Sequence, residues 1–135
     1  MDLEKSLHLS AAGLRAQGTR LRVISENLAN ANSTAREAGG EPYRRKLVAF
    51  ANEMNRALGV QTVRVSDILT DKGSFGRQFQ PGHPAADEDG YVLLPNVNPL
   101  MEMSDMREAQ RTYEANLRAI QAARTMLQGT IDLLR

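Results

Sequence analysis

The residues best suited to chemistry in this sequence lie in the stretch HPAADEDG. It brings His83, Asp87, Glu88 and Asp89 close together, and such side chains can bind metal ions. The stretch does not match an EF-hand loop, because the spaced oxygen ligands and the closing glutamate are missing. A transition-metal site would need a second histidine or a cysteine, but the chain has no cysteine and its other histidine, His8, lies far away beside a leucine stripe. We therefore expect a structured loop here, with His83 in a rigid turn, and no metal or cofactor.

A second candidate is the basic run Arg44-Arg45-Lys46, which could contact nucleic acid. It is short, it lacks interleaved aromatic residues, and it belongs to a chain whose formal net charge is only +1. These features favour a solvated strand face or a subunit contact over nucleic-acid binding. The sequence also lacks a nucleophile elbow, a phosphate-binding loop and a helix with paired histidines. We therefore expect no enzyme, no catalytic residues and no small-molecule substrate.

Asparagines are concentrated in the stretch SENLANANST, residues 25–34, where a helical pattern ends. One asparagine suits a helix end, and Asn27, Asn30 and Asn32 could all be simple caps. Three of them favour hydrogen bonds to the backbone of neighbouring segments. Asn96 and Asn98 form a similar amide-rich stretch before the last helical segment. We expect both stretches to be junctions between helices and the rest of the protein.

The elements that would position these residues are two helical segments at the ends of the chain. In the first segment, hydrophobic residues recur with the 3-4 spacing of a coiled coil. Small residues near this stripe allow another backbone to approach closely. The helix is expected to need partners to become fully ordered, because its glycines weaken it. The two interleaved rows are Leu7, Leu14, Leu21 and Leu28, with Leu3, Ser10, Gln17, Ile24 and Ala31.

The C-terminal segment repeats this heptad pattern. Asn98 can cap its start, and Pro99 suits the first helical position because its missing N–H has no partner there. The polar seam residues Gln17, Gln110 and Arg124 are expected to cost stability and to set the register. The two rows are Met106, Tyr113, Ile120, Leu127 and Leu134, with Met103, Gln110, Leu117, Arg124 and Ile131.

The middle of the chain has β character, with strands expected near residues 43–50 and 60–69 and in the run YVLLP, separated by turn-rich loops. We therefore predict a mainly α fold in which the terminal helices form an antiparallel coiled coil around a small β-rich insertion. Leu28 would lie near Met103, and Leu7 near Leu127. The expected domains are 1–34 (N-terminal helix and junction), 35–98 (insertion) and 99–135 (C-terminal helix).

Composition excludes several other classes of protein. Aromatic residues make up only 4% of the chain, which argues against a thick core. No stretch approaches the about 20 apolar residues needed to span a membrane. The charged start MDLEKSLHLS does not resemble a secretory signal. Periodicity alone therefore leaves open a soluble two-helix hairpin, a cytoplasmic coiled-coil adaptor, or an assembly module.

The stretch AAGLRAQGTRLRVISENLANANST resembles the N-terminal signature of the flagellar axial proteins, which form the rod and hook. The succession PxHPxAD, GYV, PNVN, EM and AxRxYEAN, together with GEPYRRKLVAF, resembles the short proximal-rod members of that family. The resemblance covers essentially the whole chain. Pro99 and Leu100 depart from a more usual β-branched pair, and Gln80 departs from a more usual aspartate.

This resemblance implies a structural subunit that assembles with itself and with other rod proteins through its terminal helices to transmit torque for motility. It also implies a periplasmic rod location in the flagellar basal body, reached through the flagellar type III export apparatus without a cleavable signal peptide. Another rod or hook-base subunit is the alternative within the family. The residues expected to pack helices are Leu7, Leu14, Leu21, Ile24, Leu28, Tyr113, Leu117, Ile120 and Leu127, and those expected at junctions are Asn27, Asn30, Asn96 and Asn98.

Overall fold

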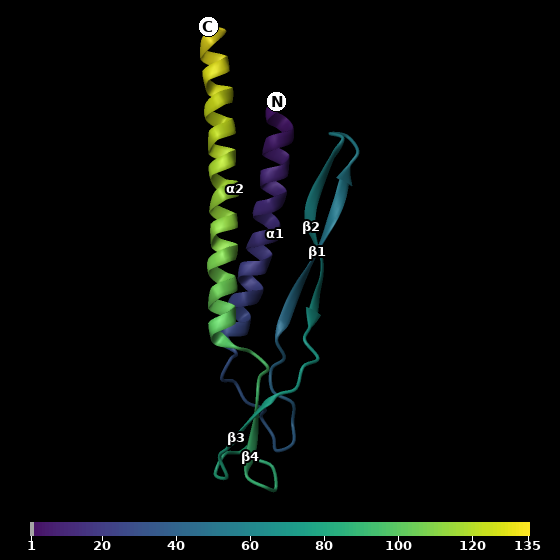
Figure 1. The fold of residues 1–135 in the computed structure, drawn as a ribbon, viewed down its shortest axis with the longest axis vertical. Coiled ribbons are helices and arrows are strands. Elements are labelled where there is room, and N and C mark those ends of the chain that lie inside the picture. Colours follow the sequence, from purple (N-terminus) through teal and green to yellow (C-terminus); the bar gives the residue numbers. More distant parts are fainter. Residues whose placement is uncertain (1) are drawn as a thin grey trace. The chain divides into compact units, whose positions relative to one another are not determined.

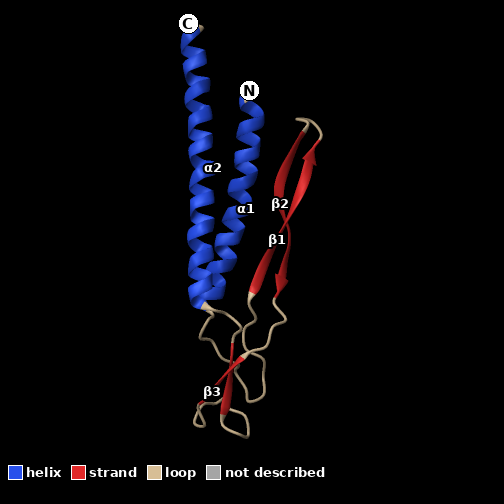
Figure 2. Cartoon of the chain, in the orientation of Figure 1, coloured by secondary structure: helices blue, strands red, loops and turns tan. Residues whose placement is uncertain are grey.

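The computed structural model describes residues 2–135. Two long terminal helices pack together, and small β-sheets lie between them in the sequence, so the predicted fold class is confirmed (Figure 1). Helices contain 46% of the residues, and loops make up much of the region around the two short strands (Figure 2). The elements are, in order, α1 (Leu3–Ala29), β1 (Lys46–Asn55), β2 (Val60–Thr70), β3 (Gly76–Phe79), β4 (Tyr91–Leu94) and α2 (Pro99–Leu133).

The chain forms two compact units, and each is described by itself below. The first unit contains the chain up to Leu21, the segment Val48–Asp67 and the segment Arg107–Arg135. The second unit contains Arg22–Leu47 and Ile68–Met106. Each long helix therefore contributes residues to both units.

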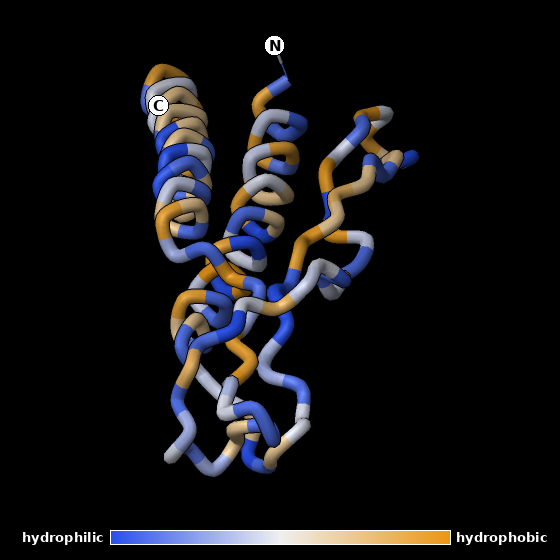
Figure 3. Tube along the Cα trace, turned by 60° about the horizontal axis from the view of Figure 1, so that its bottom comes forward, coloured by the Kyte–Doolittle hydropathy of each residue, from blue (hydrophilic) through white to orange (hydrophobic). Residues whose placement is uncertain are grey.

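Helix α1 begins directly after Asp2, whose carboxylate accepts hydrogen bonds from the backbone N–H groups of Glu4 and Lys5 at 3.1 and 3.4 Å. Such a side chain satisfies N–H groups that have no partner inside the helix. Apolar and polar residues alternate along both helices, as expected for elements buried on one side (Figure 3). The buried residues of α1 are small up to Ala16 and larger after it: Ser10, Ala12, Gly13 and Ala16, then Val23, Ile24 and Asn27.

Helix α2 begins at Pro99, and the side chain of Asn98 accepts a hydrogen bond from the N–H of Leu100 at 3.1 Å. This is the start that the sequence predicted. Its buried residues are Glu102, Ala109 and Ala123, which fall on one seven-residue row that also contains the partly exposed Asn116. This small and polar row, rather than the neighbouring leucine rows, is therefore the most buried row of α2.

The two helices are antiparallel, because residues later in α1 contact residues earlier in α2. A Cβ atom added at Gly13 would lie 2.8 Å from the side chain of Asn116, and Arg20 donates to Glu108 at 3.4 Å. This register places Leu7 at the height of Ala122 rather than near Leu127, where the sequence placed it. The difference arises because the register is set by the close approach of Gly13 to Asn116 and by the Arg20–Glu108 contact, and not by the leucine rows from which it was predicted.

The strands form two separate two-stranded sheets. The expected strands are found as β1, β2 and β4, with shifted ends. Strand β3 was missed, because its four residues are all exposed and carry no hydrophobic alternation. It exists because it pairs with β4, in a register that joins Gly76 to Leu94 and Phe79 to Tyr91. Within residues 2–135, neither helix combines the length and the apolar character that crossing a membrane requires.

Candidate assembly site: a polar junction and an apolar helix face

Asn27, near the end of α1, is the centre of a polar junction in the second unit. Its side chain is 1% exposed. The side-chain oxygen accepts hydrogen bonds from the hydroxyl of Tyr43 at 2.7 Å and from the N–H of Lys46 at 2.9 Å. The amide nitrogen donates to the carbonyl of Lys46 at 2.9 Å and to the carboxylate of Glu102 at 3.2 Å. One amide thus joins the end of α1 to the first residue of β1 and to the first turn of α2.

Glu102, the second buried polar residue of this junction, is also 1% exposed. A buried carboxylate is costly unless it is paired and hydrogen-bonded. Arg45 provides this partner, because its Nε donates to Glu102. The same guanidinium lies 3.6 Å from Asp105 and 3.9 Å from Asp71. Arg45 is therefore surrounded by three carboxylates of its own chain.

These contacts change the interpretation of the basic run. The sequence suggested that Arg44, Arg45 and Lys46 form a solvated face or a subunit contact. Each instead has a partner in its own unit: Arg44 stacks 4.3 Å from the ring centre of Phe75 and Lys46 lies 3.0 Å from Glu26. The long side chains are half-buried because the two helices and β1 converge here, and this convergence cannot be read from local sequence.

Two side chains in the junction have shifted pKa values. The hydrogen bond from Lys46 is the main cause that lowers the pKa of Glu26, and the positive charges of Lys46 and Arg22 act in the same direction, against a smaller opposing effect of burial. The pKa of Tyr43 is raised, mainly by burial and also by the nearby carboxylates of Glu26 and Glu102. The junction thus favours a charged Glu26 and a neutral Tyr43.

The other asparagines fall into two groups. Asn96 connects segments, since its oxygen accepts from the N–H of Arg45 at 2.8 Å and its nitrogen donates to the carbonyl of Asp71 at 3.1 Å. Asn30 and Asn98 instead bond to their own helices; Asn30 donates to the carbonyl of Glu26 at 2.9 Å. Sequence reasoning singled out these amides and the basic run that contains Arg45, but it did not predict the pairing of Arg45 with Glu102 and it missed Glu102 altogether. The available signal was the position of Glu102 on the seven-residue row of α2.

The loop that suggested a metal site is held together by its own side chains. The Nδ1 atom of His83 accepts from the N–H of Ala85 at 3.0 Å. One oxygen of Asp87 accepts from the N–H groups of Asp89 and Tyr91 at 3.0 and 2.8 Å. Within residues 2–135, no three histidine, aspartate or glutamate side chains are grouped so that they could hold a metal ion.

The hydrophobic residues predicted to pack helices differ widely in burial. Ile24 is 5% exposed, whereas Tyr113, Leu117 and Leu127 are 36%, 40% and 44% exposed. The difference arises because the row of Glu102, Ala109 and Ala123 is the buried side of α2, so the leucine rows of that helix are rotated away from the buried side. The remaining residues of the predicted set are half-buried: Leu7, Leu14, Leu21, Leu28 and Ile120.

In the first unit, the hydrophobic rows of both helices lie on the same side of the pair. The close approach of Gly13 and Asn116 shows which side of each helix faces the other helix. One residue further on, Leu14 and Leu117 are each rotated by about 100°. Because the helices are antiparallel, equal rotations turn both side chains to the same side. We call this surface the leucine face; it consists of Leu7, Leu14 and Leu21 of α1 and Tyr113, Leu117, Ile120 and Leu127 of α2.

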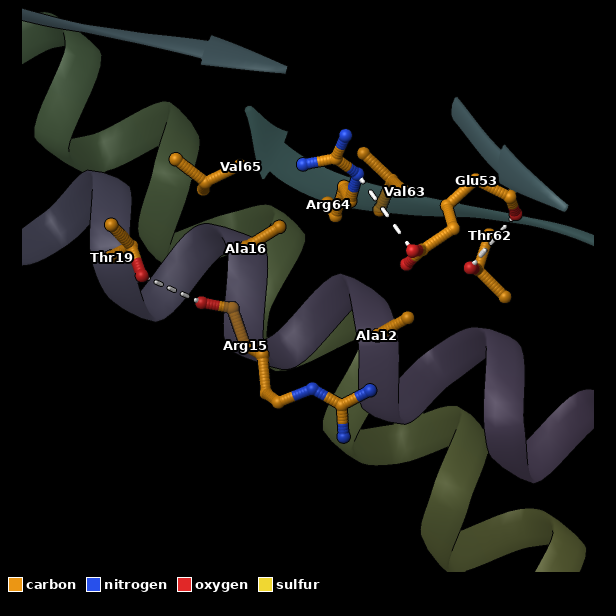
Figure 4. A pocket seen from close by; sticks show the side chains of 9 residues that line it. All are labelled: Ala12, Arg15, Ala16, Thr19, Glu53, Thr62, Val63, Arg64 and Val65. Atoms are coloured by element: carbon orange, nitrogen blue, oxygen red, sulfur yellow. Dashed lines mark hydrogen bonds and ion pairs between the residues drawn. The ribbon is translucent and has the colours of Figure 1, made fainter. Parts of the chain in front are cut away.

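The hairpin formed by β1 and β2 covers the other side of α1 in this unit. Ala12 and Ala16 face Val63 and Val65 across a hollow of about 180 Å³, and the side chain of Arg15 points away from it (Figure 4). The small side chains bring the hairpin close without filling the space completely. The hairpin therefore leaves the leucine face uncovered.

Comparison with known proteins shows that this chain is similar to flagellar basal-body rod proteins. Residues 88–133 match the protein family described as flagellar basal body rod FlgEFG protein C-terminal. A flagellar basal-body rod protein FlgC of Agrobacterium fabrum is 48% identical over 133 residues, which cover 98% of this chain and 96% of that protein. The FlgC proteins of Borreliella burgdorferi and Bacillus subtilis are each 38% identical, over 152 and 143 residues. These alignments cover 100% and 95% of this chain, and 99% and 95% of the two proteins.

Proposed function

Because this chain belongs to the FlgC family of flagellar basal-body rod proteins, we propose that it builds the proximal part of that rod by packing its terminal helices against neighbouring subunits. It is a structural subunit of the basal-body rod, and its family is not one of enzymes. The family also implies assembly with other rod proteins. In this proposal the assembled subunits, including further copies of this chain, transmit torque for motility.

The uncovered leucine face is the main observation that supports this proposal. Three of its side chains, Tyr113, Leu117 and Leu127, remain more than a third exposed, although they occupy the heptad rows of a long helix. Complete burial of such a side chain stabilises a contact by about 1.5–3 kcal/mol. An exposed row of this kind in a soluble domain marks an interaction surface. Neighbouring subunits of the rod would supply the missing contacts.

The polar junction supports the mechanical part of the proposal. Asn27, Arg45 and Glu102 connect both helices to the start of β1 through hydrogen bonds and an ion pair. Such a buried network has defined geometry and resists rearrangement more than an apolar contact does. We propose that residues 1–34 and 99–135 form the axial part of the subunit, that residues 35–98 form an outer insertion, and that the asparagine junctions join them.

We further propose that the chain reaches the periplasmic rod through the flagellar type III export apparatus. A chain that passes a narrow channel must unfold first. The absence of cysteine, and hence of disulfide bonds, is compatible with such passage. The small amount of aromatic core points in the same direction.

The experiment is a substitution in the leucine face followed by isolation of hook–basal bodies. Leu117→Asp places a charge on the face, and we expect the exported protein to be missing from the rod and swarming to be lost. The matched control is Arg118→Asp on the same helix, because the Arg118 side chain is 81% exposed and lies a further 100° away from the leucine row. Normal amounts of the Leu117→Asp protein in isolated basal bodies would contradict the proposal.

A further inference from the structure

A groove with a volume of about 410 Å³ lies between α1 and the tip of the β1–β2 hairpin, within the first unit. Two exposed arginines line it: Arg15 of α1, and Arg56 in the turn that connects β1 to β2. Neither guanidinium forms an ion pair with another residue in the described range 2–135. We call this space the arginine groove. It presents positive charge that the chain itself does not neutralise.

The arginine groove adjoins the hollow of about 180 Å³ between α1 and β2, since Arg15 and Thr62 line both spaces. The side chain of Arg15 points away from the hollow, whose walls include the small apolar residues Ala16 and Val63 (Figure 4). An unfilled space of this kind loses van der Waals contacts that an inserted apolar group would restore. A partner that reaches the two arginines can therefore also place an apolar side chain in the hollow.

The charge around these two spaces is unbalanced. Among the described residues that line them, Glu53 is the single acid, and its carboxylate lies 3.9 Å from the Nε of a third arginine, Arg64. Three arginines against one glutamate leave a formal excess of two positive charges when His8 is neutral. The whole chain carries a formal net charge of only +1, so this excess is local. It favours a partner that brings negative charge to this one place.

The shape of the site favours a polypeptide over a membrane or a nucleic acid. A groove between a helix and a hairpin is concave, and a flat bilayer surface cannot enter it. Nucleic-acid sites combine basic residues with stacking aromatic side chains, and the described residues that line the groove and the hollow include no aromatic one. A peptide can supply both a carboxylate, which matches the fork of a guanidinium, and a neighbouring apolar side chain.

From these observations we propose that the arginine groove binds an acidic segment of a different rod protein. Carboxylates of that segment pair with Arg15 and Arg56, and one of its apolar side chains fills the hollow beside Ala16. The inference rests on the proposed rod function, because the family implies assembly with other rod proteins. It adds a contact site formed by α1 and the hairpin, and the chemistry of the segment that this site takes.

The first test is photo-crosslinking in assembled basal bodies. Met54 lines the arginine groove and is 54% exposed, so Met54→p-benzoylphenylalanine places a photoreactive group at the site. After illumination of hook–basal bodies, we expect mass spectrometry to find an adduct with a segment of another rod protein that carries two or more acidic residues close to an apolar one. The matched control is Met126→p-benzoylphenylalanine, because Met126 is 52% exposed and lies outside the groove. Its adducts should not contain that segment.

The second test changes the charge of the groove in the Met54→p-benzoylphenylalanine chain. Arg15→Glu and Arg56→Glu should each lower the yield of the adduct at least severalfold, because a like charge then faces the acidic segment. Arg56→Lys should keep most of the yield. Arg118→Glu makes the same change of charge on an 81% exposed side chain of α2 and should leave the yield unchanged. Arg56→Gln alters only an exposed turn residue, so it should lower the yield even if a charge-reversed chain fails to fold.

Several results would overturn the groove as a site for an acidic segment while leaving the rod function intact. These are an adduct with a segment that lacks acidic residues, with a second copy of this chain or with lipid, the absence of any adduct at Met54, and a yield that Arg56→Gln does not change. Absence of the unsubstituted chain from isolated hook–basal bodies would instead refute the rod function, and with it this contact.

Discussion

Replacement of Asn27 tests whether the polar junction, rather than apolar packing, holds the second unit together. Asn27→Ala removes four hydrogen bonds, to Tyr43, to both backbone groups of Lys46 and to Glu102. Each such bond contributes about 0.5–1.5 kcal/mol, and a buried group left without a partner costs about 1–3 kcal/mol. We therefore expect a loss of about 3 kcal/mol or more in the free energy of unfolding of this unit.

Asn27→Asp sharpens the test, because it keeps the shape of the side chain but removes its two donor bonds. The introduced carboxylate would face the carboxylate of Glu102, which is 1% exposed, so the loss at neutral pH should exceed that of Asn27→Ala. Protonation at acid pH would return a donor and remove the repulsion. The difference between the two variants should therefore become smaller as the pH falls.

The assay is urea unfolding followed by circular dichroism, together with hydrogen exchange at the N–H of Lys46, which reports on this unit alone. Asn30→Ala is the matched control, since Asn30 donates only to the carbonyl of Glu26 in its own helix and should cost less than about 1 kcal/mol. Equal losses for Asn27→Ala and Asn30→Ala, within about 0.5 kcal/mol, would refute the reasoning.

Three further outcomes follow from the structure. Gly18→Ala, where an added Cβ has open space, should stabilise α1 by up to about 1 kcal/mol in thermal unfolding, whereas Gly13→Ala should gain less, because its Cβ would lie 2.8 Å from the facing asparagine amide. Lys46→Met should raise the pKa of Glu26 in an NMR titration, because it removes the hydrogen bond and the charge that lower this pKa. In the unchanged protein the Lys46–Glu26 pair stabilises the fold fully at pH values above the pKa of Glu26 in the unfolded chain. This contribution should be lost as the pH falls through the lower pKa of Glu26 in the folded state. Gly90→Ala should destabilise the β3–β4 hairpin by about 1–3 kcal/mol, measured by hydrogen exchange, because Gly90 has φ +84°.

Much of the architecture could be predicted because it depends on local rules. The start of α2 is specified by Asn98 and Pro99, a cap and a first-turn residue that act within a few positions of each other. The long heptad patterns specify two long helices in the same way. Strand β3 could not be predicted, because its exposed residues carry no alternation and its existence depends on pairing with β4.

The residues of the candidate site were also only partly predictable from the sequence. The sequence by itself determined which residues could form an apolar row, since seven-residue spacing follows from helix geometry alone. Only the tertiary structure decided that Ala109 and Ala123 are buried in α2 while Leu117 and Leu127 stay exposed, because the rotation of a helix about its axis depends on what it packs against. The same holds for Arg45 and Glu102, which pair because β1 and α2 converge from distant parts of the chain.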